Sequence, residues 1–361
     1  MMLRIVLWAS LALASIYAWQ EWRETEALYP DVWAFWSFAR YAATHAPATI
    51  YDDHALHLYQ AELGLPAENG FYPFPYPPWF LLILTPLGWL PYPAAALLWR
   101  GVTFGALVWA VGAWRWRWDR ALLLAVAPAC VLGFVVGQNG FLTAALMLGG
   151  LRLLPGRPWL GGALLGACAY KPQLAVLVPV FLVFGRHWRA VGGAALAAMA
   201  LTAATVLAFG IQMWPAWLAS MQAQVMALTA GRGPKLDIMP TVTAAVQLLG
   251  GGTGLARVMQ GIAALAAVAL LWRMRGTTNP AVLPLAALVT TPYAFGYDLP
   301  VVTAAALLAL PAAAGVQQVM LLLCVLAPCV LSIPGAVILL PVLFCVTLGS
   351  IAWSFDAKAT P

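Results

Sequence analysis

Apolar runs of roughly helical-span length alternate with short polar breaks along almost the whole chain. A helix needs about 20 apolar residues to cross the hydrocarbon core of a membrane. Backbone polar groups inside that core must be satisfied within the spanning structure itself, which a helix does. The pattern therefore predicts an all-α fold, a polytopic transmembrane helical bundle of about 12 spans.

The predicted spans are bounded by charged or turn residues. They cover about 3–19, 94–113, 121–136, 141–154, 159–170, 174–185, 190–210, 255–272 and 281–291, with about three more in 299–353. The apolar run 79–90 is short and is broken by Pro91 and Pro93. If it crossed as well as 94–113, the arginines at 115–120 would be external, against the charge rule, so we expect an interfacial or partly inserted helix there. Several spans are shorter than about 20 residues. Their polar breaks would then lie near the membrane surface, where irregular backbone is stable only beside a protein cavity.

Two polar segments interrupt the apolar pattern. The first covers 20–78 and holds eight of the twelve acidic residues: Glu21, Glu24, Glu26, Asp31, Asp52, Asp53, Glu62 and Glu68. The second covers 211–240. We interpret 1–361 as one integral membrane domain in which both segments lie outside the membrane on the external, periplasmic side. Each is expected to carry an interfacial helix, at about 32–44 and 215–228.

Charge and composition support a membrane protein. Hydrophobic residues make up 63% of the chain and charged residues 8%, whereas soluble domains have about 25% charged residues. The mean hydropathy is +0.87. The net charge is +6, but the basic residues form short clusters between apolar runs, so no nucleic-acid partner is expected. Under the positive-inside rule these clusters mark cytoplasmic loops. We expect a multi-pass protein of an inner or plasma membrane, which is bacterial by the family resemblance given below.

Several chemistries lack support in the sequence. The five cysteines all fall inside apolar runs, as small core residues do. The chain has no P-loop, GxGxxG, GxSxG or CxxC motif. Asp52 and Asp53 are adjacent acids beside His54 and His57, but two acids opening a helix explain this cluster more simply than a metal site. We therefore expect no metal and no cofactor.

A few polar residues interrupt the apolar runs where a ligand could bind. Lys171 follows an apolar run on the predicted external side, against the charge rule, so we expect a partner or a ligand to hold it. It either snorkels to the interface or provides a point charge for a phosphate group. Arg232 and Lys235 offer the same choice.

Carboxylates and amides near the same predicted side could contact a sugar. Asp31 either caps the helix at 32–44 or takes part in chemistry, and Asp298 either caps a helix end or contacts a sugar hydroxyl. Gln138 and Asn139 are amides suited to hydroxyl groups, although Asn139 and Gly140 also suit a turn.

Five segments, taken in order, resemble a known family. They are YPDVWAFWSFARYA (29–42), YPFPYPPWFLLILTPLGWLP (72–91), GQNGFLTAALM (137–147), AYKPQLAVLVPV (169–180) and TPYAFGYDLPVV (291–302). Over about 25–310 the chain resembles glycosyltransferase family 87. The resemblance implies a GT-C-type membrane enzyme similar to polyprenol-phosphate-mannose-dependent α-mannosyltransferases. Such an enzyme moves a sugar from a polyprenyl-phosphate donor to a lipid or glycan acceptor, among membrane lipids.

The resemblance also implies roles for residues at matching positions. Asp31 would be the general base of an inverting transfer, and Lys171 would help to hold the donor phosphate. The other residues implied in substrate binding are Gln173, Tyr72, Tyr76, Gln138, Asn139, Arg232, Tyr293 and Asp298. The family often has a histidine-containing segment where this chain has Pro292, Tyr293 and Ala294, so no histidine role is carried over.

Alternatives remain open at this point. A transporter or a flippase of lipid-linked sugars could have a similar number of helices. Such a protein would place polar residues near the middle of the membrane and show inverted repeats. Here polarity is concentrated on the external side, which favours an interfacial enzyme. Asp52, Asp53 and Asp298 are the other candidates for the catalytic base.

Overall fold

A computed structural model describes residues 31–66, 71–112, 118–229, 236–333 and 335–357, with isolated positions at 8, 11, 12 and 15. Every element in this part of the chain is helical, which confirms the all-α class. Most of the first predicted span, 3–19, and the loop with Arg232 and Lys235 lie outside the described residues.

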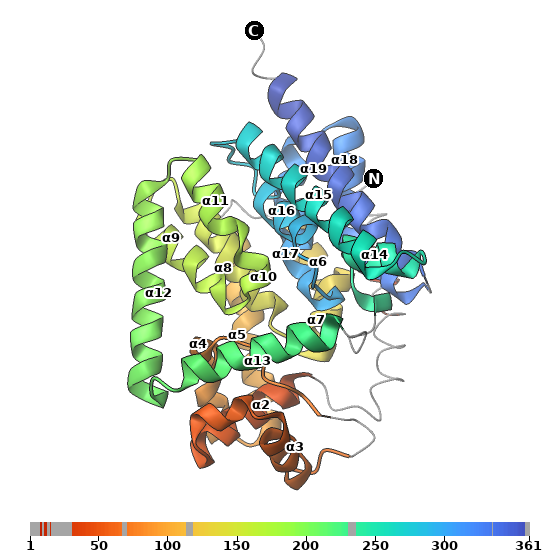
Figure 1. Cartoon of the computed structure of the whole chain (residues 1–361). Coiled ribbons are helices and arrows are strands. Elements are labelled where there is room, and N and C mark those ends of the chain that lie inside the picture. Colours follow the sequence, from red (N-terminus) through yellow and green to blue (C-terminus); the bar gives the residue numbers. More distant parts are fainter. Residues whose placement is uncertain are drawn as a thin grey trace.

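One group of helices comes from the first polar segment and the residues just after it. It consists of α2 (Asp31–Thr44), η1 (Pro47–Tyr51), α3 (Asp53–Glu62), α4 (Pro78–Leu84) and η3 (Thr85–Trp89). The helix expected at 32–44 is α2, and it packs against α4 and η3. Its aromatic side chains are buried in a cluster with those of α4. Helices α2 and α3 lie at the bottom of Figure 1, which we call the α2 end.

A second group stands above the α2 end. It consists of α5 (Tyr92–Gly112), α6 (Trp118–Val126), α7 (Pro128–Val136), α8 (Gly140–Leu153), α9 (Pro158–Ala167), η4 (Cys168–Tyr170), α10 (Pro172–Ala175), α11 (Leu177–Phe184) and α12 (Trp188–Phe209). Here α5 packs on α8, α8 on α9, and α9 on α12. Helix α13 (Met213–Thr229) crosses between this group and the α2 end (Figure 1).

The third group is the C-terminal half. It consists of η5 (Leu236–Ile238), α14 (Val242–Leu248), α15 (Thr253–Arg273), α16 (Val282–Thr290), η6 (Gly296–Asp298), α17 (Pro300–Ala309), η7 (Leu310–Ala312), α18 (Gly315–Leu326), η8 (Ala327–Ser332), η9 (Ala336–Ile338) and α19 (Leu339–Ala357). Helix α17 packs against α8, which joins the third group to the second. One apolar core runs through both groups.

Four helices in the described part are long and apolar enough to cross a membrane: Tyr92–Gly112, Trp188–Phe209, Thr253–Arg273 and Ala336–Phe355. Five shorter apolar helices accompany them, so the predicted 12 spans are not confirmed. The run 121–136 shows one reason, since it is divided into α6 and α7 at Ala127. Pro128 has no N–H to continue the hydrogen bonds of α6.

Glycines let α9 and α12 approach each other closely. A Cβ on Gly162 would overlap the backbone of Ala190, and one on Gly193 would overlap the carbonyl oxygen of Trp159. A Cβ on Gly166 would lie 2.8 Å from the Cα of Ala194. Without a hydrophobic driving force between helices in lipid, such close backbone packing is a main source of association. These glycines therefore hold α12, which is mostly exposed, on the bundle.

We predict that Gly162→Val lowers the stability of the folded protein by about 1–3 kcal/mol, because the new side chain forces α9 and α12 apart. Thermal unfolding of the purified protein in detergent measures the change. Gly261→Val on α15 is the matched control, because a Cβ there meets nothing within 4 Å. Equal effects of the two substitutions would contradict the packing argument.

Candidate active site

Asp31 begins α2 at the α2 end of the molecule. Its side chain is partly exposed, whereas the next residues, Val32 and Trp33, are 0% and 2% exposed. A carboxylate in the first turn of a helix is favoured by the unpaired N–H groups there. Burial of the following apolar residues fixes α2 on the core, and this places Asp31 at the edge of the packed core.

An amide from a distant loop orients that carboxylate. Gln138 Nε2 donates a hydrogen bond to Asp31 Oδ2 over 3.1 Å. Gln138 Oε1 accepts from the backbone N–H of Asn139 at 2.9 Å and from the hydroxyl of Tyr76 at 3.4 Å. These two donors fix which end of the Gln138 amide faces Asp31. Tyr76, Gln138 and Asn139 from the predicted set therefore lie together beside Asp31.

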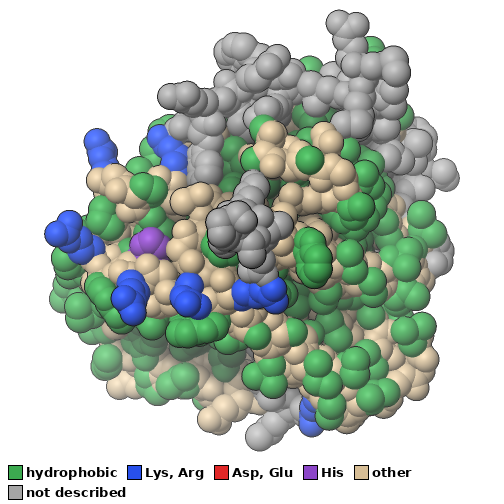
Figure 2. Space-filling view, turned by 90° about the horizontal axis from the view of Figure 1, so that it is seen from above, with side chains coloured by type: hydrophobic (Ala, Val, Ile, Leu, Met, Phe, Trp, Pro, Cys, Tyr) green, Lys and Arg blue, Asp and Glu red, His purple; other side chains and the backbone are tan. Residues whose placement is uncertain are grey.

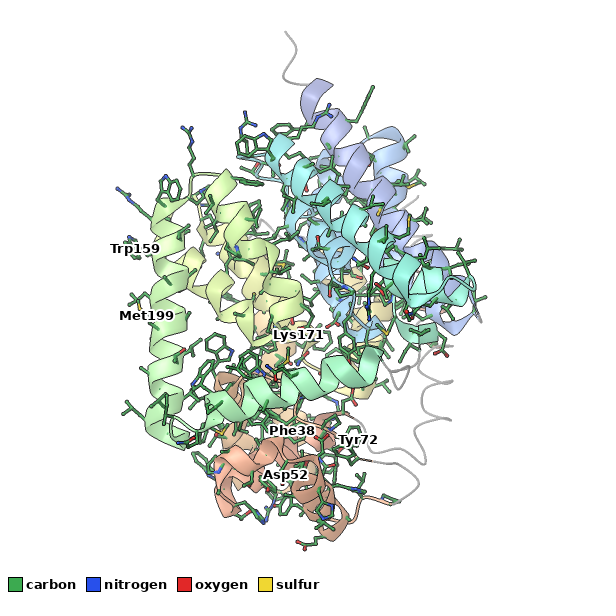
Figure 3. The ribbon with its side chains drawn as sticks, viewed as in Figure 1. Phe38, Asp52, Tyr72, Trp159, Lys171 and Met199 are labelled. Atoms are coloured by element: carbon green, nitrogen blue, oxygen red, sulfur yellow. The ribbon has the colours of Figure 1, made fainter. Side chains whose placement is uncertain are left out.

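Lys171 lies behind this amide and is 3% exposed. Its Nζ donates to Asn139 Oδ1 at 2.5 Å and forms an ion pair with Asp298. It also lies 5.1 Å from the centre of the Tyr297 ring. Figure 3 labels Lys171 in the interior of the molecule, above the α2 end. Lys171 therefore does not snorkel to a surface. The sequence predicted that a partner or a ligand holds it, and the structure gives Asp298 and Asn139 as its partners.

Asp298 is held from both sides. Its second oxygen, Oδ2, accepts from the backbone N–H of Phe295 at 3.0 Å, which caps the short helix η6. Its side chain is 1% exposed. The capping role predicted as one alternative for Asp298 is therefore confirmed, and the same carboxylate forms the ion pair with Lys171.

Two glycines allow the GQNG loop (137–140) to pack closely against Val32 and Tyr297. Gly137 has a φ of +69°, and a Cβ there would lie 2.7 Å from the side chain of Val32. A Cβ on Gly140 would overlap the carbonyl oxygen of Tyr297. Only glycine permits both the left-handed conformation and such close backbone contact at low cost. The loop therefore lies between the start of α2 and the segment before α17.

Tyr72 and Tyr76 come from the proline-rich segment after α3. Gln60 holds this segment, since its Nε2 donates to the carbonyl oxygen of Tyr72 at 3.0 Å and its Oε1 accepts from the Tyr72 N–H at 2.9 Å. The Tyr51 hydroxyl donates to the carbonyl oxygen of Tyr76 at 2.8 Å. The centre of the Trp33 ring lies 6.2 Å from the centre of the Tyr72 ring. Aromatic faces therefore gather next to Asp31.

The surroundings of Asp31 change its acidity. Removal of water by the surrounding protein raises the pKa of Asp31 from 3.8 to about 6, although the hydrogen bond from Gln138 and the positive charge of Lys171 both lower it. Burial, together with the nearby charge of Asp31, raises the pKa of Tyr72 to about 12. At neutral pH the site therefore contains an ionised Asp31 beside a neutral tyrosine.

Other predicted residues lie farther from this network or outside it. Gln173 is partly exposed on α10, and Tyr293 is partly exposed with its ring 5.0 Å from that of Phe295. Arg232 lies outside the described residues. Asp52 caps α3 by accepting from the N–H groups of His54 and Ala55, as the simpler explanation predicted. Among the described residues, no group of three or more His, Cys, Asp or Glu could hold a metal ion.

Three supporting residues were not predicted. The Tyr170 hydroxyl donates to the carbonyl oxygen of Asn139 at 3.0 Å, and Gln60 holds Tyr72. Arg100 on α5 donates to the carbonyl oxygens of Phe134 and Val135 at 2.6 and 3.0 Å, just before the GQNG loop. An arginine within an apolar span was the available signal for Arg100. Tyr170 lies in the segment 169–180 that carries the resemblance, but no sequence feature indicated its supporting role, and nothing marked Gln60.

Comparison with known proteins gives the identity of the family. A family model described as Glycosyltransferase family 87 matches residues 74–294, more than half of the chain. The chain belongs to glycosyltransferase family 87. No curated protein and no solved structure matched it.

The family 87 match covers most of the network around Asp31. Tyr76, Gln138, Asn139 and Lys171 lie inside the matched range, whereas Asp31 and Asp298 lie outside it but contact residues within it. The protein is a glycosyltransferase and acts on a sugar donor and an acceptor. Its candidate active site is the hydrogen-bonded network that runs from Asp31 to Asp298.

We predict that Lys171→Met destabilises the protein by about 3–5 kcal/mol, because it leaves the buried Asp298 carboxylate without a partner. Chemical or thermal unfolding in detergent measures the loss. The double variant Lys171→Met/Asp298→Asn is the control and should recover part of that stability, since the unpaired charge is gone. A double variant no more stable than Lys171→Met would contradict this explanation.

Proposed function

We propose that this family 87 enzyme transfers a sugar, mannose by family resemblance, from a polyprenyl-phosphate donor to a hydroxyl of a lipid or glycan acceptor. The observation that carries the proposal is Asp31, a partly exposed residue whose carboxylate accepts a hydrogen bond from Gln138. Asp31 is the proposed general base. The reaction is placed at the membrane surface on the α2 end, the external face in our interpretation.

The proposed step is a single displacement. Asp31 accepts the proton of the acceptor hydroxyl as its oxygen attacks the anomeric carbon of the donor sugar. The bond from that carbon to the phosphate oxygen breaks, and its electron pair leaves with the polyprenyl phosphate. Attack from the face opposite the leaving group inverts the anomeric configuration. The step assigns no role to a metal or a cofactor.

The acidity of Asp31 suits this role. A general base works best when its pKa lies near the working pH, because it is then ionised and still able to take a proton. The pKa of about 6 at Asp31 is closer to that condition than the ordinary value of 3.8. The Gln138 amide also fixes the direction of one carboxylate oxygen.

Lys171 is the proposed source of positive charge for the leaving phosphate. The ammonium group has three N–H donors, and Asn139 and Asp298 use two of them. The third N–H is the one assigned to the donor phosphate. Tyr72 and Tyr76 are proposed to contact the sugar, with Gln138 and Asn139 as hydrogen-bonding groups. Asp298, Gln173, Tyr293 and Arg232 complete the proposed set.

The charge distribution supports the proposed orientation. The arginine-bearing loops 154–157, 185–187 and 274–281 join helices at the end away from α2. By the positive-inside rule that end faces the cytoplasm. The donor lipid would then approach Asp31 from the opposite, external leaflet.

We predict that Asp31→Asn lowers sugar transfer by about 10²–10⁴-fold, because asparagine cannot accept the hydroxyl proton. The assay follows release of polyprenyl phosphate from a panel of polyprenyl-phosphate sugars by the purified protein in lipid, with an acceptor present. Asp52→Asn is the matched control, since asparagine also caps a helix. It should retain near-normal turnover.

Near-normal transfer by Asp31→Asn would overturn the assignment of the base. Absence of release with every donor in the panel would favour transport of a lipid-linked sugar instead. Flux of that lipid across vesicles would then be measured.

A second prediction concerns pH. Asp31 is ionised above its pKa and protonated below it, so transfer should rise as pH increases from 5 to 7, with a midpoint near 6. Initial rates at subsaturating donor, measured across this range, give the profile. A rate that stays constant between pH 5 and 7 would contradict the raised pKa or the role of Asp31.

A further inference from the structure

A cavity lies at the end of the molecule away from Asp31. Its volume is about 300 Å³, and its lining comes from the end of α8, from α11, from the loop before α12 and from the loop between α15 and α16. The polar lining residues are Arg152, His187, Thr277, Thr278 and Asn279. No Asp or Glu is part of the lining. The proposed transfer reaction does not use this cavity.

Arg152 supplies an unsatisfied positive charge at the wall of the cavity. Its guanidinium carbon lies 5.1 Å from the centre of the Trp109 ring, which holds the side chain in place. Its Nη1 is buried and has no hydrogen-bond partner in the described part of the chain. A buried N–H of a charged group without an acceptor costs more than an ordinary unmade hydrogen bond. Arg152 lines the cavity and is partly exposed, so an anionic ligand there would lie beside a guanidinium whose hydrogen bonds are not all satisfied.

The loop at 277–279 adds neutral donors. Asn279 Oδ1 already accepts from the Ala281 N–H at 3.0 Å, and Thr277 Oγ1 accepts from the Asn279 N–H at 3.2 Å. Neither bond uses the side-chain N–H groups of Asn279 or the hydroxyl of Thr278, which leaves these groups as donors for a ligand. An arginine with several neutral donors and no carboxylate matches the chemistry of a phosphate group.

The other walls are apolar, and they favour a lipid over free phosphate. Leu151, Leu154, Pro155, Phe181 and Pro280 line the cavity beside the polar groups. Exposed tryptophans lie on the helix ends around it: Trp109, Trp159, Trp188 and Trp272 are 57%, 54%, 61% and 54% exposed. Tryptophans gather at the level of lipid headgroups. The cavity therefore lies where a headgroup phosphate and the first part of its acyl chains would meet the protein.

The face around the cavity is basic. Seen from above in Figure 2, Lys and Arg side chains gather on one side of this end, around a histidine, and no described Asp or Glu is visible there. Arg157, Arg186, Arg189 and Arg275 are exposed at these helix ends. Burial lowers the pKa of His187, so its ring is neutral at pH 7 and acts as a hydrogen-bonding group rather than a charge.

The geometry points to a specific site for an anionic phospholipid in this cavity, with the headgroup phosphate on Arg152 and the loop at 277–279. The basic face attracts anionic lipids of the same leaflet, and Arg152 then selects one of them. This site is separate from the donor lipid at Asp31, since the two lie at opposite ends of the bundle.

Native mass spectrometry of the full-length protein tests the site, with phosphatidylglycerol as the probe in detergent micelles. We expect the wild type to retain phosphatidylglycerol and Arg152→Gln to bind it about tenfold more weakly, the effect of one charge-assisted hydrogen bond. Asn279→Asp keeps the acceptor for the Ala281 N–H but adds a negative charge, so it should weaken binding at least as much.

Arg189→Gln is the matched control, because it removes an exposed arginine from the same face without touching the cavity. It should change binding by less than about twofold. Equal losses in Arg189→Gln and Arg152→Gln would overturn the site in favour of diffuse attraction. Displacement of the lipid by an equal concentration of inorganic phosphate would overturn the lipid in favour of free phosphate. Absence of retained phosphatidylglycerol in the wild type would overturn the proposal entirely.

Discussion

The buried ion pair between Lys171 and Asp298 is the interaction on which the site depends. It joins the segment before α10 to the turn before α17, and through Asn139 it reaches the GQNG loop. Removing two charges from water costs several kcal/mol for each, and such a pair contributes little net stability. The pair instead fixes the positions of the two segments, because each charged side chain must remain in contact with its partner. Gln138, and with it Asp31, is placed by that requirement.

The residues of this network could be identified from the sequence, but their connections could not. Lys171 and Asp298 stood out because charges are rare in apolar runs, and Asp31 stood out through family resemblance. The pairing of Lys171 with Asp298 spans 127 residues, and no local pattern specifies such a contact. Gln60 and Tyr170 were missed because a polar side chain that supports a distant backbone has no periodicity of its own.

For the fold, too, the sequence predicted the individual elements better than their arrangement. Hydrophobic runs predicted the all-α class, and the long helices α5, α12 and α15 lie close to the predicted spans. The division of 121–136 at Pro128 and the short α9 were not anticipated in the number of spans. Apolar composition marks a segment as buried in lipid or protein, and it does not distinguish a full crossing from a short helix within the core. Packing against neighbours makes that distinction.

The raised pKa of Asp31 affects how the stability of the folded protein depends on pH. Most carboxylates in folded proteins are more acidic than in the unfolded chain, so acid weakens the fold. Asp31 has the opposite sign: its pKa is about 6 in the folded protein against an ordinary 3.8. The folded chain therefore takes up this proton more readily than the unfolded chain does. As pH falls from 6 toward 3.8, protonation of Asp31 removes an unfavourable buried charge, so this residue stabilises the folded chain relative to its state at neutral pH.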